Sequence, residues 1–141
     1  DVSLVFEKSD KKNKTRIKKW IIQTIEMKKR ETGAINFIFC SDRYLLSINK
    51  QYLNHDTFTD IITFDYSKDL KNEPLSGDIF ISIERIRENA VTFSKTIENE
   101  LHRVIIHGIL HLLGYKDKTK DAKEQMTKQE NACLKLLEKM I

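Results

Sequence analysis

The segment AINFIFC, residues 34–40, is the feature that most restricts what this chain can fold into. All but one of its residues are apolar, and Gly33 directly before it stops any preceding helix. A short, nearly continuous apolar run is typical of a strand whose two faces are both buried, not of a strand with one face in water. We therefore expect a strand here that is covered on both sides.

Strands and helices alternate along the rest of the chain. The expected strands are 2–6, 61–66 and 77–83, and the expected helices are 15–30, 42–52, 84–94, 96–113 and 119–140. Because no βαβ unit repeats, the order favours the α+β class: one domain over residues 1–141, with a small mixed four-stranded sheet packed against about five helices. On the helix 42–52, capped by Ser41 and Asp42, the residues expected to point inward are Leu45, Leu46, Ile48 and Tyr52.

The composition is that of a soluble globular protein, with 33% charged residues and 40% hydrophobic residues. The apolar runs are too short for a signal peptide or a membrane span, so we expect a cytoplasmic protein with no membrane partner. Cys40 and Cys133 are far apart and form no CxxC motif. They are therefore expected to be two free, buried thiols in a reducing compartment.

The net charge of +4 is distributed unevenly. Residues 8–30 are rich in lysine and arginine and poor in acids, and a second lysine-rich segment covers residues 116–128. The default interpretation of such a segment is the solvated face of an amphipathic helix. The alternative is a surface that binds the phosphate backbone of a nucleic acid, and both interpretations remain open at this point.

The stretch HGILHLLGYKD, residues 107–117, carries the clearest chemical signal. On the expected helix, His107 and His111 are four residues apart and share a face, with Cβ atoms about 5–6 Å apart. This spacing presents two imidazoles to one tetrahedral metal ion. Gly114 can end the helix in a left-handed conformation, which would bring Asp117 back as a third ligand. Three protein ligands with one open position are typical of a catalytic metal site.

The helix pattern is similar to that of zinc proteases, in which a glutamate follows the first histidine and acts as general base. Here that position is Gly108, which we expect to leave open space beside the ion for a bulky substrate. A conventional zinc protease is therefore disfavoured. Glu100 lies on roughly the same face and is either a hydrogen-bond partner of an imidazole or a surface residue. His102 is expected to be a surface or packing residue, and His55 is left unassigned.

The same stretch resembles the HGxLHLxGYDH signature of the YbeY-type bacterial endoribonucleases. Further motifs of that family follow in register from about residue 34 to 135. They are Asn49 and Tyr52 before DTFTDIITF (56–64), GDIFI (77–81), Glu100-Leu101, and Met126, Gln129 and Glu130. Several independent motifs in the right order make the resemblance specific.

The resemblance implies a hydrolase: a zinc-dependent, single-strand-specific endoribonuclease. Its implied roles are ribosomal RNA processing, including 16S rRNA 3′-end maturation, and ribosome quality control. One Zn²⁺ per chain would be bound by His107, His111 and Asp117, and a metal-activated water would cleave the phosphodiester bond. The implied partners are ribosomal RNA and ribosomal particles, with ribosomal proteins or an assembly GTPase as further candidates.

Two positions depart from the family pattern. Asp117 stands where the family has a third histidine, and because carboxylate oxygen also binds Zn²⁺, a His₂Asp site is expected. Leu53 stands where the family usually has an arginine implicated in catalysis. The candidates to replace that cation are Arg43, Lys116 and Lys118. If none does, the alternative is a non-catalytic ribosome-assembly or RNA-binding factor with a structural metal, and a metallopeptidase is a further alternative.

The remaining site candidates lie before and within the expected strand 61–66. Asp60 is a candidate to accept a proton during the reaction, besides the metal itself and bulk solvent. Thr59 and Thr63 are candidates for contacts with the substrate. Capping and strand packing are an equal alternative for both threonines.

Overall fold

The computed structural model describes residues 2–4, 11–67 and 73–140. In chain order the elements are β1 (Val2–Leu4), α1 (Lys11–Met27), β2 (Thr32–Cys40), α2 (Asp42–Leu53), β3 (Ile61–Asp65), β4 (Leu75–Ser82), α3 (Ile83–Thr92), α4 (Ile97–Leu112) and α5 (Lys120–Lys139). The expected α+β class and the five helices are confirmed within these residues. The end of the expected strand 2–6 and the middle of the loop after β3 lie outside the described residues.

The strands form one mixed sheet in the order β1-β2-β4-β3. β1 pairs with β2 and β2 with β4 in parallel, whereas β3 runs antiparallel to β4. The parallel pair β2–β4 is joined through α2 and the edge strand β3, and the chain then returns along β4, antiparallel to β3. This places the carboxyl end of β4 next to the segment that enters β3, where Ser82 N–H donates to the carbonyl oxygen of Asp60 at 3.0 Å.

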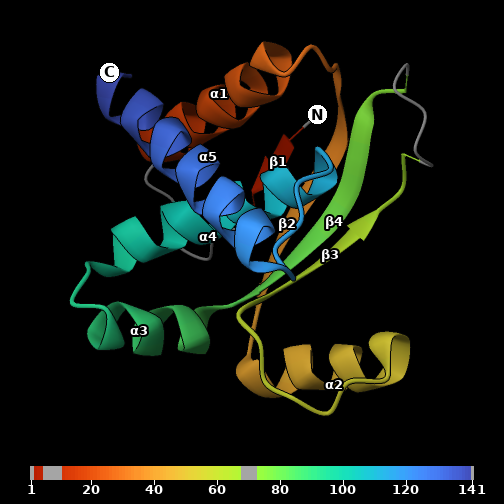
Figure 1. Ribbon diagram of the computed structural model, residues 1–141. Helices are drawn as coiled ribbons and strands as arrows, with labels where there is room; N and C mark the ends of the chain where they lie inside the picture. The colour runs from red at the N-terminus through yellow and green to blue at the C-terminus, as the bar shows by residue number, and fades with distance from the viewer. Residues whose placement is uncertain (1, 5–10, 68–72, 141) are drawn as a thin grey trace.

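One face of the sheet carries the main hydrophobic core, formed with α1, α4 and α5 (Figure 1). The sheet contributes side chains that alternate along the strands, among them Ile35, Phe37, Ile79 and Ile81. α4 lies between this face and α5, and buried apolar residues extend around most of its circumference. Trp20 of α1 is fully buried in the same core, and its indole N–H donates to the carbonyl oxygen of Cys133 at 2.8 Å.

The opposite face is covered only in part, by α2 at one end of the sheet (Figure 1). Leu45, Ile48 and Ile62 form a small buried cluster there. The expectation that 34–40 is buried on both faces is therefore wrong for its first half, where Asn36 is exposed. α2 begins immediately after β2, so it can cover only the carboxyl end of that strand.

α2 begins as expected, with the Ser41 side chain accepting the N–H of Tyr44 at 3.1 Å. Tyr52, however, does not point inward: it is 62% exposed, and its ring meets the edge of Phe64. The inward position belongs to Asn49, whose side-chain amide donates to the carbonyl oxygen of Thr57 at 2.8 Å. The amide thus ties α2 to the segment that leads into β3.

Both cysteines are free, as expected: Cys133 is buried and Cys40 is half-buried. Burial raises the pKa of the Cys40 thiol to about 11, which keeps the sulfur protonated and unreactive. Among the described residues, no helix combines the length and the apolar character needed to cross a membrane.

Candidate metal centre

The carboxyl end of α4 builds the candidate site. α4 ends at Leu112, and Gly114 follows with φ of +104°, in the left-handed region that favours glycine. Gly114 N–H donates to His111 O, and Tyr115 N–H donates to Leu110 O, both at 3.0 Å. These two bonds are those of a Schellman motif. The turn expected at Gly114 is confirmed, and it directs the following residues back toward the histidines.

Three side chains meet at this turn. His107 Nε2 lies 2.9 Å from His111 Nε2, and Asp117 Oδ2 lies 3.2 Å from the first and 3.3 Å from the second. A tetrahedral zinc ion with bonds of about 2.0–2.2 Å holds its ligand atoms about 3.3–3.6 Å from one another. The observed triangle is slightly tighter than that. Its atoms could therefore share one ion of this size.

The other ring nitrogens determine which tautomer each histidine adopts. His107 Nδ1 lies 2.6 Å from Glu130 Oε2, and His111 Nδ1 lies 3.0 Å from the carbonyl oxygen of Tyr115. Because both partners are acceptors, each Nδ1 carries a proton. In the neutral rings both Nε2 lone pairs then point at the same place as the Asp117 carboxylate. Such an arrangement is unfavourable without a cation, so the donor set fits a metal ion such as Zn²⁺.

Glu130 comes from α5 and was missed as a site residue by the sequence analysis. Its side chain is buried, and Arg103 Nη1 donates to its other oxygen, Oε1, at 2.8 Å. A signal for it exists in the sequence. Glu130 lies on the apolar stripe of α5, between Met126 and Cys133, where an acid would be buried at a cost unless it had a partner.

The two histidines differ in their electrostatic setting. Burial lowers the pKa of His107, but the hydrogen bond and charge of Glu130, with the charge of Asp117, outweigh it and raise the net pKa. Burial and the nearby positive charge of His107 lower the pKa of His111. His111 therefore loses its proton more readily than His107, and a metal ion binds the neutral form of either ring.

Two further acids lie near this centre. Burial raises the pKa of the Asp60 carboxyl, against the positive charges of His107 and Arg85. Burial also raises the pKa of Glu100, and the negative charge of Asp60 adds to the effect. Glu100 is only 7% exposed, so its interpretation as a surface residue is wrong. It is not the partner of an imidazole Nδ1 either, because Glu130 and Tyr115 O take those places.

Gly108 does not leave open space beside the ion, as the sequence analysis expected. A Cβ atom at this position would lie 2.9 Å from Ile61 Cδ1 and 3.1 Å from Ile79 Cγ2. The glycine therefore faces the sheet, where Ile61 and Ile79 fill the space beside it. Its role is to let α4 approach β3 and β4 closely.

The candidates for substrate contact differ in their exposure. Thr59 and Thr63 are half-buried, and the Thr59 hydroxyl donates to the carbonyl oxygen of Ile61 at 3.3 Å. The three candidate cations are exposed: Arg43, Lys116 and Lys118. His55 is exposed as well, whereas His102 is buried with its ring against Trp20, so it is a packing residue.

Arg85 is a cation that the sequence analysis did not consider. Its guanidinium is 2.6 Å from Asp42 Oδ2 and 2.8 Å from Glu88 Oε2, and it lies over the exposed ring of Phe58. Its charge also lowers the pKa of Asp60. Nε of Arg85 is buried and has no hydrogen-bond partner among the described residues. Arg85 therefore belongs to the surroundings of the site.

The fold and the site together define a small α+β protein with a three-ligand candidate metal centre at the end of one helix. A model of the family described as endoribonuclease YbeY matches residues 4–138. The chain belongs to the endoribonuclease YbeY family, and the resemblance noted from its motifs is confirmed.

Curated relatives named endoribonuclease YbeY agree with this assignment. The protein of Flavobacterium psychrophilum is 52% identical over 117 residues, which cover 83% of this chain and 81% of the relative. The protein of Cytophaga hutchinsonii is 47% identical over 125 residues, which cover 89% and 86%. A solution structure of a Thermotoga maritima protein is similar with a TM-score of 0.64 and 28% identity, covering 96% of this chain and 90% of that one.

Proposed function

We propose that this protein is a metal-dependent endoribonuclease that hydrolyses single-stranded ribosomal RNA, including the 3′ end of 16S rRNA. The observation that carries the proposal is the convergence of His107 Nε2, His111 Nε2 and Asp117 Oδ2 within 3.3 Å of one another. Neutral imidazole and carboxylate ligands suit zinc, and three of them leave one position open for chemistry. Membership of the YbeY family supplies the reaction class.

One Zn²⁺ per chain would be bound by His107, His111 and Asp117. When bound, it lowers the pKa of a water molecule toward about 7 and polarises a phosphoryl oxygen. Glu130 and the carbonyl oxygen of Tyr115 hold the two rings through Nδ1, which leaves each Nε2 available to a metal. Asp60 has a raised pKa and lies close enough to sense the charge of His107, so it is the chain's candidate to accept the proton.

The RNA would be held by groups around this centre. Thr59 and Thr63 border the segment that carries Asp60, and the exposed cations suited to phosphate contacts are Arg43, Lys116 and Lys118. The basic segments 8–30 and 116–128 would contact the backbone without reading sequence. In the cell the partners would be ribosomal particles in the cytoplasm, with ribosomal proteins or an assembly GTPase, and the role would include ribosome quality control.

The decisive experiment is cleavage of a labelled single-stranded RNA that spans a 16S rRNA 3′ end. Zinc-loaded wild type is compared with His107→Ala and with His55→Ala, an exposed histidine that serves as the matched control. We expect cleavage by wild type and His55→Ala and none by His107→Ala. Equal behaviour of wild type and His107→Ala would show that the chemistry does not occur at this site.

The second candidate is a non-catalytic ribosome-assembly factor in which the metal serves stability. The observation that favours it is Leu53, a 43% exposed leucine where the family usually has a catalytic arginine. It predicts that a chelator lowers the melting temperature, that pre-ribosomal RNA is still bound, and that no RNA is cleaved. A metallopeptidase is disfavoured, because the position of its general base is Gly108, which is packed against the sheet.

A further inference from the structure

The two candidate metal ligands on α4 are supported in different ways. His111 is held by the carbonyl oxygen of Tyr115, four residues further on, through the turn that ends its own helix. His107 is held by Glu130, which is 23 residues away and belongs to α5. The orientation of His107 thus depends on how α5 packs against α4. The orientation of His111 depends only on local backbone geometry.

The Glu130 carboxylate has a partner at each of its two oxygens. Its Oε2 is 2.6 Å from His107 Nδ1, and its Oε1 accepts from Arg103 Nη1 at 2.8 Å. Arg103 Nη2 in turn donates to Asn131 Oδ1 at 2.8 Å. The guanidinium is therefore bound by two adjacent residues of α5, Glu130 and Asn131. Each carboxylate oxygen therefore has one partner, and the carboxylate cannot turn away from His107 without breaking the bond to Arg103.

This arrangement is costly for stability alone. Glu130 is only 6% exposed, and burying an ion pair is often no better than packing apolar side chains of similar size. The neighbouring residues of the same α5 stripe are apolar: Met126, Cys133 and Leu137. A buried carboxylate in that stripe is explained by what it does for the imidazole, which is to fix the proton on Nδ1 and leave Nε2 to the metal.

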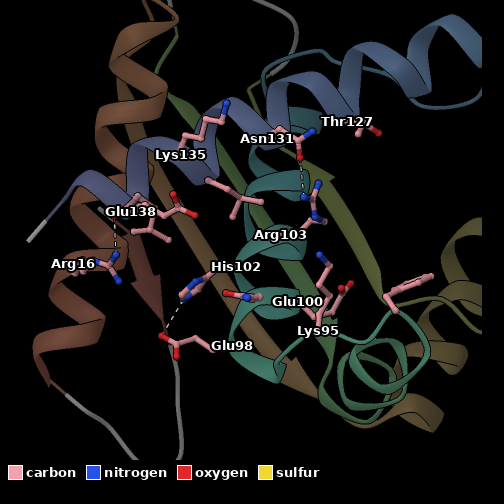
Figure 2. A pocket seen from close by; sticks show the side chains of 14 residues that line it. Arg16, Lys95, Glu98, Glu100, His102, Arg103, Thr127, Asn131, Lys135 and Glu138 are labelled. Carbon is pink, nitrogen blue, oxygen red and sulfur yellow. Dashed lines mark hydrogen bonds and ion pairs between the residues drawn. The ribbon is translucent and has the colours of Figure 1, made fainter.

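Figure 2 shows Arg103 from the side on which it borders a cavity. Arg103 and Asn131 border a cavity of about 960 Å³ between α4 and α5. The Arg103 side chain is 35% exposed, whereas that of Glu130 is 9% exposed. Arg103 therefore lies between solvent and the buried carboxylate. Removing Glu130 would therefore leave the Arg103 guanidinium partly in solvent and not as a buried cation.

We propose that Glu130 and Arg103 are positioning residues of the metal centre. Glu130 fixes the ring and tautomer of His107, and Arg103 acts through Glu130 by occupying its second oxygen. The inference rests on the proposed function only in that the site binds a metal. It does not depend on which substrate is cleaved.

The test measures metal affinity and not activity. Zn²⁺ affinity is determined by competition with a chromophoric chelator for wild type, Glu130→Leu and Glu130→Gln. Glu124→Gln is the matched control, because Glu124 is an exposed acid on the same helix. Loss of a hydrogen-bond partner of a metal-bound histidine weakens metal binding about 10–100-fold, and we expect this for Glu130→Leu. Glu130→Gln should fall between, because one amide oxygen cannot accept from both His107 and Arg103. Glu124→Gln should match wild type.

A double-mutant cycle tests the order of action. Arg103→Met alone should weaken Zn²⁺ binding by less than Glu130→Leu does. Added to Glu130→Leu, it should weaken binding no further, because Arg103 has no role once Glu130 is gone. Additive losses would contradict the claim that Arg103 acts through Glu130.

Two readouts separate positioning from a structural role. The visible absorption spectrum of the Co²⁺-loaded protein should change in Glu130→Leu, since it reports ligand geometry. If Glu130 were only structural, its removal would lower the unfolding free energy and leave the Zn²⁺ affinity and the Co²⁺ spectrum of the folded protein unchanged, which would overturn the inference. If wild type binds zinc and the Glu130 variants bind it equally well, this inference alone is refuted. Wild type that binds no zinc refutes the proposed function as well.

Discussion

The two faces of the sheet are packed very differently. On one face, side chains of α1, α4 and α5 form a continuous core with Ile79 and Ile81. On the other face, α2 covers one end, and three residues make up the buried cluster: Leu45, Ile48 and Ile62. The candidate metal ligands all come from α4 and the turn after it, on the closely packed side. Tyr52 and Leu53, at the end of α2, are exposed.

The contrast between the two faces indicates where the sequence of this protein can vary. A metal centre needs ligand atoms held within a few tenths of an ångström, which only a close-packed surrounding can provide. The partly covered face makes no such demand. It is there that the chain carries Leu53, its departure from the arginine usual in the family. At the second departure, Asp117, a carboxylate oxygen stands in place of an imidazole nitrogen beside His107 and His111.

The largest effect is expected from opening the closely packed face. Ile105 of α4 is fully buried, and Ile105→Ala should lower the unfolding free energy by about 3–5 kcal/mol, the upper part of the range for such truncations. Ile62→Ala, in the small cluster, should cost about 2 kcal/mol, because neighbours there can relax toward solvent. Urea unfolding of the metal-free proteins measures both. Equal losses would mean that the two faces are packed equally well.

The next effect concerns the ligand that the turn brings back to α4. Asp117→Ala should weaken Zn²⁺ binding at least about 100-fold, since one of three protein ligands is lost. Asp117→His should retain zinc, because imidazole is an equally suitable ligand at the same position. Metal content after dialysis, measured by atomic absorption, distinguishes the outcomes. The assignment of Asp117 as third ligand fails if the alanine variant keeps as much zinc as wild type.

A smaller effect is expected where α4 meets the sheet. In Gly108→Ala the new Cβ would press on Ile61 and Ile79, and overpacking of this kind costs about 1–3 kcal/mol. The helix gains about 1 kcal/mol from alanine, so the net loss should be about 1 kcal/mol. Thermal unfolding measures it, and Ile61→Val in the same chain should restore part of it by removing Cδ1. If stability were unchanged and RNA cleavage impaired, Gly108 would instead be needed for the approach of the substrate.

The smallest effect is a pH dependence from Glu100. Its pKa is raised above the ordinary value of 4.5, first by burial. A raised pKa means that the folded state binds the proton more tightly, so this contribution is full below pH 4.5 and is lost as the pH rises through the shifted pKa. Glu100→Gln should therefore be more stable than wild type at pH 7, with the gain vanishing at low pH. Urea unfolding across pH, with Glu124→Gln as control, checks this. A gain that persists below pH 4 would have another cause.

The local features of this protein follow from short stretches of its sequence. The spacing of His107 and His111, the left-handed turn at Gly114 and the return of Asp117 all follow from helix geometry and from the freedom of glycine. Whether a segment forms a helix or a strand follows in the same way from the spacing of its apolar residues. These features depend on residues a few positions apart, so the chain specifies them before it folds.

Which helices and strands contact one another, in contrast, depends on the packing of the whole chain. The sequence could not indicate that Glu130 holds His107, that Gly108 faces Ile79, or that β2 is covered on its second face only at one end. Each depends on how the helices pack on the sheet. That packing is set by the free energy of many buried side chains together. A residue's neighbours along the chain carry almost no information about that packing. The grouping of the three candidate metal ligands could therefore be predicted from the sequence, whereas the support of His107 by α5 could not.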